Sequence, residues 1–543
     1  MPPMPKTVRP SMLLTPLLAL GRAPLVDYLW LRATRLKEEG RFFDAYQLSE
    51  MICELQPKFA AVWGFQGWNM AYNISVTLKS PEERWRWVRN GYELIRDKGI
   101  PLNPNNTQLY RELAWILFHK VGDFMDEWHF YYKLQFALLM EDILGPPPED
   151  YVQPGRVAGD YYREYDYASL AEAPERFEEL VADADVAELA EKLRGFGFDV
   201  DKSGVYLGLL AALRDGTAQV PNAPEGERET RLHDLKALMN DPATAPPRKR
   251  IEHYWRARRL REEMKLDLRR IVTIQKDFGV TLDFRLPEAH ALYWANLGME
   301  KGLDARTNVD IHKLNTNRIE FFCLQKMFHR GRLAMSENAK LGEPPLLSPD
   351  IRVIPALFDA LVRDSKTYLE EEHEKSPVSI NFRTTFVGFA RTAIMRYHRL
   401  GMQKEAQEMF DYLSKNFPDK MYDKGLDGFL TEQMKGEMEV NDFRIVEQRV
   451  EELIRAGIVR YAYGEDDEAV RYMARAKQVY EGYQKGVVSK RLKIQAEFAE
   501  IVQTCVHQFG GQMYRGSYEI VCRKLGLEPL PQETSTKPAD VPA

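Results

Sequence analysis

Cysteine is scarce in this chain of 543 residues, and its scarcity excludes two classes of site. The four cysteines are Cys53, Cys323, Cys505 and Cys522, and none of them lies in a C-x-x-C pair. A zinc ribbon and a thioredoxin-type site therefore have no support, and a disulfide framework is not expected in so long a chain. We interpret the cysteines as small buried apolar residues, which leaves the cellular compartment undecided.

A strong excess of one charge is also missing. Lys plus Arg number 75 and Asp plus Glu number 81, so the formal net charge is −6. This balance excludes a generally basic nucleic-acid binder. The strong catalytic signatures are absent as well, including G-x-x-x-x-G-K-[ST], H-E-x-x-H and G-x-S-x-G. The histidines are scattered, and we interpret His119 and His129 as hydrogen-bonded helix residues. The sequence predicts no catalytic residue, no metal ligand and no cofactor.

Long hydrophobic runs are absent from the body of the chain. A membrane-spanning helix needs about 20 apolar residues, and the stretch 12–31 reaches that length only by including Arg22, Asp27, two prolines and a glycine. Residues 12–20 follow two basic residues and read MLLTPLLAL, which is typical of a secretory signal or an anchor. The alternative is an N-terminal arm packed on the first helices. The chain is thus membrane-associated or extracytoplasmic through residues 12–31, or else cytoplasmic.

Alternating strand patterns are nearly absent, whereas helix signals dominate. Apolar residues recur at spacings of three and four through most of 25–145 and 251–525. The sequence therefore predicts an all-α fold. A long helical chain of this kind calls for a search for internal repeats.

Small residues recur at fixed places in several of the expected helix pairs. The first unit comprises Leu29, Ala33, Leu36, Gly40, Ala45, Ile52 and Pro57. The second unit opens in the same register with Trp63 and Gly67. A third comprises Tyr397, Gly401, Ala406, Phe410, Leu413 and Pro418. The clearest comprises Leu453, Ala456, Gly457, Gly464, Ala469, Met473 and Ala476.

This pattern resembles the tetratricopeptide repeat, a helix–turn–helix unit of 34 residues. Its small residues lie where the two helices of a pair approach most closely, and its proline ends the second helix. The matches cover about a third of the chain. The resemblance implies a right-handed superhelix of helix pairs with a concave groove that binds a protein or peptide.

Composition divides the chain further. We expect the following order: an N-terminal apolar leader or anchor (1–24), tetratricopeptide-like repeats (25–145), an insertion with short helices and Pro-rich linkers (146–250), a helical region (251–380), further repeats (381–527) and a disordered tail (528–543). The linkers of the insertion are placed at 216–227 and 241–247 because both are rich in proline and alanine.

An aromatic patch between residues 63 and 88 is the richest candidate for binding. Trp68 and Tyr72 are four residues apart, as are Asn69 and Asn73, so each pair forms one stripe of a helix. Asn is unfavourable inside a helix, which suggests hydrogen bonding to something other than solvent. The sequence therefore predicts partner binding by Trp68, Asn69, Tyr72 and Asn73. The alternative is an aromatic core whose asparagines satisfy the loop that follows.

A basic stretch at 248–270 carries ten Lys and Arg residues against four acidic ones. It could bind an acidic partner, phosphates or anionic lipid. The alternative is a solvated helix face, or a face docked on the acidic segment 172–191.

The function implied by the resemblance is that of a non-enzymatic scaffold or adaptor for protein–protein interaction. Two alternatives remain: a helical enzyme or envelope-processing factor with an unrecognised active site, and an envelope component tethered by its N-terminus.

Overall fold

The structure is a computed structural model that describes residues 22–146, 165–302, 310–335, 339–369, 377–399, 402–438, 443–486, 493–510, 513 and 515–530. Helix is by far the commonest element in these ranges, which confirms the all-α fold. The chain divides into two compact units. The first contains Met1–Asp123, Leu139–Tyr151 and Tyr162–Glu320, and the second contains Phe124–Leu138, Val152–Tyr161 and Phe321–Ala543.

Two predicted end segments lie largely outside the described residues. Of the leader at 1–24, the structure describes only the residues from Arg22 onward, which begin a helix. Of the tail at 528–543, it describes only 528–530. Among the described residues, no helix is both long enough and apolar enough to cross a membrane. The signal, anchor and packed-arm interpretations of 12–31 therefore stay predictions.

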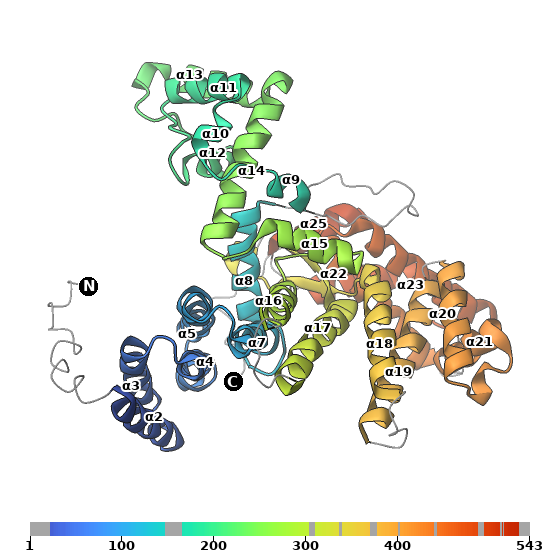
Figure 1. Cartoon of the computed structure of the whole chain (residues 1–543). Helices are drawn as coiled ribbons and strands as arrows, with labels where there is room; N and C mark the ends of the chain where they lie inside the picture. Colours follow the sequence, from blue (N-terminus) through green and yellow to red (C-terminus); the bar gives the residue numbers. More distant parts are fainter. Residues whose placement is uncertain are drawn as a thin grey trace. The chain divides into compact units, whose positions relative to one another are not determined.

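The first unit begins with helices that pack in pairs (Figure 1). Their bounds are α2 (Arg22–Glu38), α3 (Phe42–Leu55), α4 (Ala60–Trp68), α5 (Pro81–Leu94), α6 (Ile100–Leu102) and α7 (Thr107–Trp115). Three π-helical segments continue them, namely η2 (Asn69–Ile74), η4 (Ile95–Gly99) and η5 (Ile116–Val121), and the short 3-10 segment η3 (Ser75–Thr77) follows η2.

Local sequence explains where these helices begin and end. Gly40 adopts a left-handed φ of 75° after α2, and the next backbone N–H donates to Leu36 O at 2.8 Å, which closes the helix end. Ser80 caps α5 by accepting from the backbone N–H of Glu83, and a proline follows it at the first helical position. The helix pair α2–α3 therefore turns at the glycine that the repeat pattern assigns to the turn.

The small residues lie at close helix crossings. A Cβ atom on Gly67 would lie 2.8 Å from the carbonyl oxygen of Gly91, so α4 and α5 approach too closely there for a side chain. Ala33 and Ala45, at the matching places in α2 and α3, are fully buried. These crossings are the feature for which the repeat pattern selects small residues.

The insertion folds around its own core. Its elements are α9 (Tyr167–Ala171), α10 (Phe177–Leu180), α11 (Ala184–Gly195), α12 (Val205–Arg214), η6 (Glu225–Glu227), α13 (Arg228–Asn240), η7 (Pro242–Thr244) and α14 (Ala245–Glu262). Trp255 of α14 is buried in this core, and its Nε1 donates to Val200 O at 2.9 Å. Figure 1 shows α10 to α14 gathered together.

The linker predicted at 241–247 is wrong. Residues 242–244 form η7, and α14 starts at Ala245 with prolines in its first turn. Proline is tolerated there because the first N–H groups of a helix have no partner inside it. α14 also runs across the boundary predicted at residue 250, because residues on both sides of it pack in one core.

The rest of the first unit contains α15 (Leu268–Phe278) and α16 (Pro287–Gly302). α16 packs on α7 so closely that a Cβ on Gly298 would lie 2.5 Å from Tyr110 Cβ. Two helices, α8 (His129–Leu144) and α17 (Asp310–Arg330), contribute residues to both units.

The second unit contains further helix pairs and the strands β1 (Arg332–Ala334) and β2 (Leu346–Ser348). Its other elements are η8 (Ala339–Leu341), η9 (Ile351–Val353), α18 (Ile354–Leu369), α19 (Pro377–Arg399), α20 (Gln403–Asn416), η10 (Lys420–Tyr422), α21 (Gly425–Met438), α22 (Phe443–Ala462), α23 (Asp466–Gly486), α24 (Phe498–Gly510) and α25 (Arg515–Leu525). A Cβ on Gly457 of α22 would lie 3.3 Å from Ala469 O of α23, and Gly464 between them has a φ of 75°.

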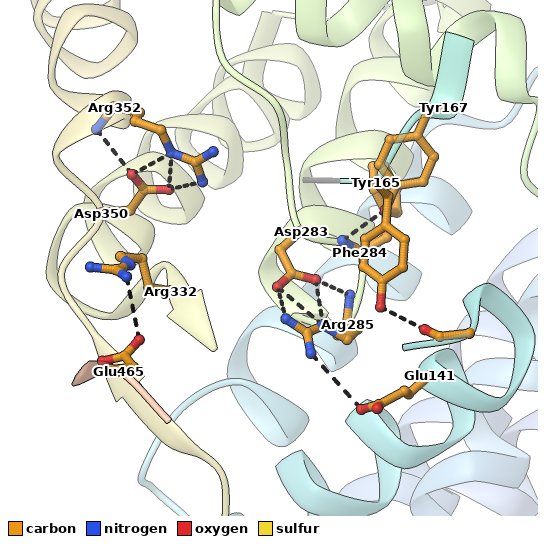
Figure 2. Close-up of polar contacts among 11 residues, drawn as sticks. Glu141, Tyr165, Tyr167, Asp283, Phe284, Arg285, Arg332, Asp350, Arg352 and Glu465 are labelled. Atoms are coloured by element: carbon orange, nitrogen blue, oxygen red, sulfur yellow. Dashed lines mark hydrogen bonds and ion pairs between the residues drawn. The ribbon is translucent and has the colours of Figure 1, made fainter. Parts of the chain in front are cut away.

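Ion pairs link the strands to these helices. Arg332 of β1 pairs with Glu465, which precedes α23, and with Glu468 in the first turn of α23. Figure 2 shows the Arg332–Glu465 pair, and it shows Asp350, which binds Arg352 through both carboxylate oxygens. The short strand pair was not expected, because three-residue strands are too brief to give an alternating pattern.

Candidate binding surface

Trp68 and Tyr72 stack on each other at the end of α4. Their ring centroids are 5.2 Å apart with an interplanar angle of 25°, and both side chains are half-buried. Trp63, five residues before Trp68, is buried instead, and its Nε1 donates to Pro57 O at 2.8 Å. The helix thus places one tryptophan in the core and the next at the surface, as the repeat register predicts.

A second pair with the same layout lies on α7. Both α4 and α7 are nine residues long and end on a tryptophan, Trp68 or Trp115. Each continues into a π-helical segment that carries an aromatic residue four positions later, Tyr72 or His119. Short π-helical segments inside helices are rare and are frequently found at functional sites. The two helices therefore repeat one local arrangement.

The two pairs meet in one row. Tyr72 lies 5.8 Å from His119 between ring centroids, and its hydroxyl is 3.2 Å from His119 Nδ1. His119 stacks on Trp115 at 4.9 Å with an interplanar angle of 11°. Trp30 of α2 contacts Phe65 of α4 at 4.9 Å, and the Lys37 ammonium group lies over the rings of both Phe65 and Trp68. We call this set the aromatic strip: Trp30, Phe65, Trp68, Tyr72, His119 and Trp115.

Two lysines flank the strip. Lys37 of α2 places its Nζ 4.3 Å from the ring centroid of Trp68, and Lys120 places its Nζ 5.4 Å from that of Tyr72. Burial raises the pKa of Tyr72 well above its usual range, and the Glu112 carboxylate adds to this shift. Tyr72 is therefore a neutral phenol at physiological pH.

The two asparagines of the predicted site have internal roles. Asn69 is fully buried, and its Nδ2 donates to Phe42 O at the start of α3 at 3.1 Å. Asn73 donates to Asn69 Oδ1 at 2.7 Å and is itself half-buried. Asn69 does not reach the surface, so its amide is explained by the α3–α4 contact and not by the loop after the helix. Of the four predicted residues, Trp68, Tyr72 and Asn73 keep exposed atoms.

The basic stretch at 248–270 is docked within the first unit. Arg250 pairs with Asp183 at 2.9 Å, just before α11, and also with Asp185 in the first turn of α11; both aspartates belong to the acidic segment. Arg256 and Arg259 reach the end of α8, where they donate to Ile143 O at 2.9 Å and Asp142 O at 3.0 Å. These arginines satisfy the terminal carbonyls of a helix that stops before three prolines.

A buried cluster of charged residues also lies at the C-terminal end of α8. Arg285 binds the Asp283 carboxylate at 2.7 Å and lies 3.9 Å from Glu141 (Figure 2). Tyr165, whose ring lies under the Arg285 guanidinium, donates to Gly145 O at 2.8 Å. The charges of this cluster pair with each other, so its role is structural. Among the described residues, no three His, Cys, Asp or Glu side chains are grouped to hold a metal ion.

Sequence reasoning found only Trp68 and Tyr72 of the aromatic strip and missed its other four residues. Trp115 was not among the predicted residues, and His119 was interpreted as a hydrogen-bonded helix residue. The signal that could have found them is the repeated spacing, because Trp115 and His119 are four residues apart like Trp68 and Tyr72. Comparisons of the chain with protein-family models, with curated proteins and with solved structures find no match.

Proposed function

We propose that the chain is a non-enzymatic, tetratricopeptide-like scaffold that binds a segment of a partner protein on the aromatic strip. The observation that carries this proposal is the repetition of a tryptophan and a second aromatic residue at two α-to-π junctions. Helix pairs in such a scaffold place the first helix of each pair on the concave side, and Trp68 belongs to the first helix of the pair α4–α5.

The physical chemistry of the strip suits binding. Half-buried aromatic side chains lose little rotamer entropy on binding and remove much apolar area from water. From Trp68 through Tyr72 and His119 to Trp115, each ring contacts the next, so these four rings support one another. A peptide chain lying along the strip would contact several rings at once, which favours a partner segment over a small molecule.

The test compares two matched pairs of variants. Peptides are selected from a displayed random library on the intact protein, and their affinities are measured by fluorescence anisotropy. Trp68→Ala with Tyr72→Ala should abolish the binding of selected peptides. Trp87→Ala should leave it unchanged, since Trp87 is also half-buried but contacts Phe43 and Tyr46 of α3 instead of the strip.

Folding is checked on the same proteins by circular dichroism and thermal melting. Selected peptides that bind the double variant as tightly as the wild type would show that the strip is only a packed aromatic cluster.

A further inference from the structure

The tryptophans that end α4 and α7 share one property: their only polar side-chain group donates hydrogen bonds. Trp68 and Trp115 each carry an indole N–H, which can only donate. Within the described part of the chain, neither indole N–H has an acceptor within hydrogen-bond distance. Both side chains are half-buried, so each N–H lies at the edge of the protein surface.

Lys37 adds a third donor of the same kind. Its ammonium group lies over Trp68 and Phe65, and no carboxylate among the described residues lies within 4 Å of it. Arg35, two residues before Lys37, pairs with Glu39 at 3.0 Å. Glu112, the carboxylate that faces Tyr72, is paired with Arg111 at 2.7 Å.

The ring faces in the middle of the strip are already occupied. Trp68 has Tyr72 and Lys37 over its ring, and His119 stacks between Tyr72 and Trp115. A ligand therefore meets ring edges, which carry partial positive charge, more than the negative faces that attract cations. This geometry disfavours a basic partner.

We propose that the partner segment is acidic, with Asp or Glu side chains alternating with apolar ones. This inference rests on the proposed function and names the chemistry of its ligand. A carboxylate would accept from Lys37, a further carboxylate or carbonyl would accept from the Trp68 and Trp115 N–H groups, and the apolar residues would cover the ring edges. Charge-assisted hydrogen bonds of this kind are stronger than neutral ones.

The experiment uses three labelled peptides of equal length, with Leu and Phe at every second position and Glu, Gln or Lys at the others. Binding to the full chain is measured by fluorescence anisotropy at two salt concentrations. We expect the Glu peptide to bind most tightly and to weaken with salt, because part of its affinity is electrostatic. The Lys peptide should bind most weakly.

Two substitutions assign the preference to the strip. Lys37→Gln should weaken the Glu peptide about fivefold and leave the Gln peptide unchanged. Trp68→Phe, which keeps a ring but removes the N–H, should weaken the Glu peptide by a similar factor, about fivefold. Arg35→Gln is the matched control, because it removes one positive charge from the exposed side of the same helix and should have little effect.

The outcomes separate this inference from the proposed function. All three peptides could bind equally well to the wild type and lose this binding in the Trp68→Ala/Tyr72→Ala variant. That result would agree with the proposed scaffold function but overturn the acidic preference. Tightest binding of the Lys peptide, or equal effects of Lys37→Gln and Arg35→Gln, would also overturn it. Three peptides that bind the wild type no better than the double variant would overturn the inference, and failure of the library selection would then remove the proposed function as well.

Discussion

The aromatic strip and the basic helix α14 both stand out in the sequence, yet the structure uses them in opposite ways. The arginines of α14 bind acceptors inside the first unit: Arg250 meets aspartates, and Arg256 and Arg259 meet the last carbonyls of α8. The strip instead leaves Lys37 and two indole N–H groups without acceptors among the described residues.

This difference teaches that unusual composition does not mark a binding surface by itself. A charged or aromatic stretch is a candidate only when its polar atoms still lack partners after folding, because a satisfied group gains little from a ligand. Three arginines of the basic stretch are bound by acceptors inside the first unit, in line with the docked-face interpretation. The aromatic patch looked partly like core, and part of it remains available.

The largest expected effect is the difference in stability between two variants of α4, one at a core tryptophan and one at a tryptophan of the strip. Trp63→Ala should lower the free energy of unfolding by about 3–5 kcal/mol, because it leaves a cavity and removes the bond to Pro57 O. Trp68→Ala should cost less than half as much, since that side chain is half-buried. Denaturant unfolding of both variants measures the difference. Equal losses would mean that the strip is core and would erase the contrast with α14.

The next variant tests the hydrogen bonds that the arginines of α14 donate to the end of α8. Arg256→Met should cost about 1–3 kcal/mol, because Ile143 O at the buried end of α8 would lose its donor. Lys249→Met is the control on the same helix: Lys249 is exposed and lies 4.0 Å from Asp166, so its loss should cost less than about 0.5 kcal/mol. If Arg256→Met is as stable as the control variant, the hydrogen bond from Arg256 to the end of α8 does not stabilise the fold, and the contrast between α14 and the strip is lost.

The third variant tests whether a close helix crossing in the second unit, away from the strip, contributes to stability. Ala469→Leu in α23 should cost about 1–3 kcal/mol by overpacking, because Ala469 is fully buried and its backbone faces Gly457. Thermal melting against Val470→Leu, an exposed neighbour, measures this. Unchanged midpoints in both would contradict the assigned register.

The smallest effect concerns a buried histidine, in contrast to the half-buried His119 of the strip. His290 Nε2 lies 2.8 Å from Phe284 O, and burial lowers the pKa of His290 to about 3. The unfolded chain takes up a proton below about pH 6.5 whereas the folded chain does not, so stability is present above that pH and is lost as the pH falls.

This linkage predicts that the free energy of unfolding falls by about 1–2 kcal/mol between pH 7 and pH 5. His290→Gln, which keeps an N–H donor and does not titrate, should flatten the pH dependence in that window, and His119→Gln serves as the comparison. A slope that survives in His290→Gln would assign it to other groups. Urea titrations at several pH values provide the measurement.

Much of the fold was accessible from the sequence because it depends on short-range rules. The three-and-four spacing of apolar residues predicts the helices, and Gly40 and Gly464 predict the left-handed turns between them. Ala33, Gly67 and Gly457 mark the crossings, because only small residues fit where two helices nearly touch. The start of α14 was missed because proline reads as a linker signal, although it is tolerated in a first turn.

The binding surface could be predicted only in part. The spacing of Trp68 and Tyr72 places them on one stripe of a helix by local geometry alone. Whether that stripe meets Trp115 and His119, 47 residues further along, depends on how α4 and α7 pack and on the π-helical turn that ends each of them. The sequence by itself thus determined that the chain is helical and where the turns of α2–α3 and α22–α23 lie. The tertiary structure decided which polar groups remain without partners, because hydrogen bonds between distant segments are set by packing and leave no local pattern.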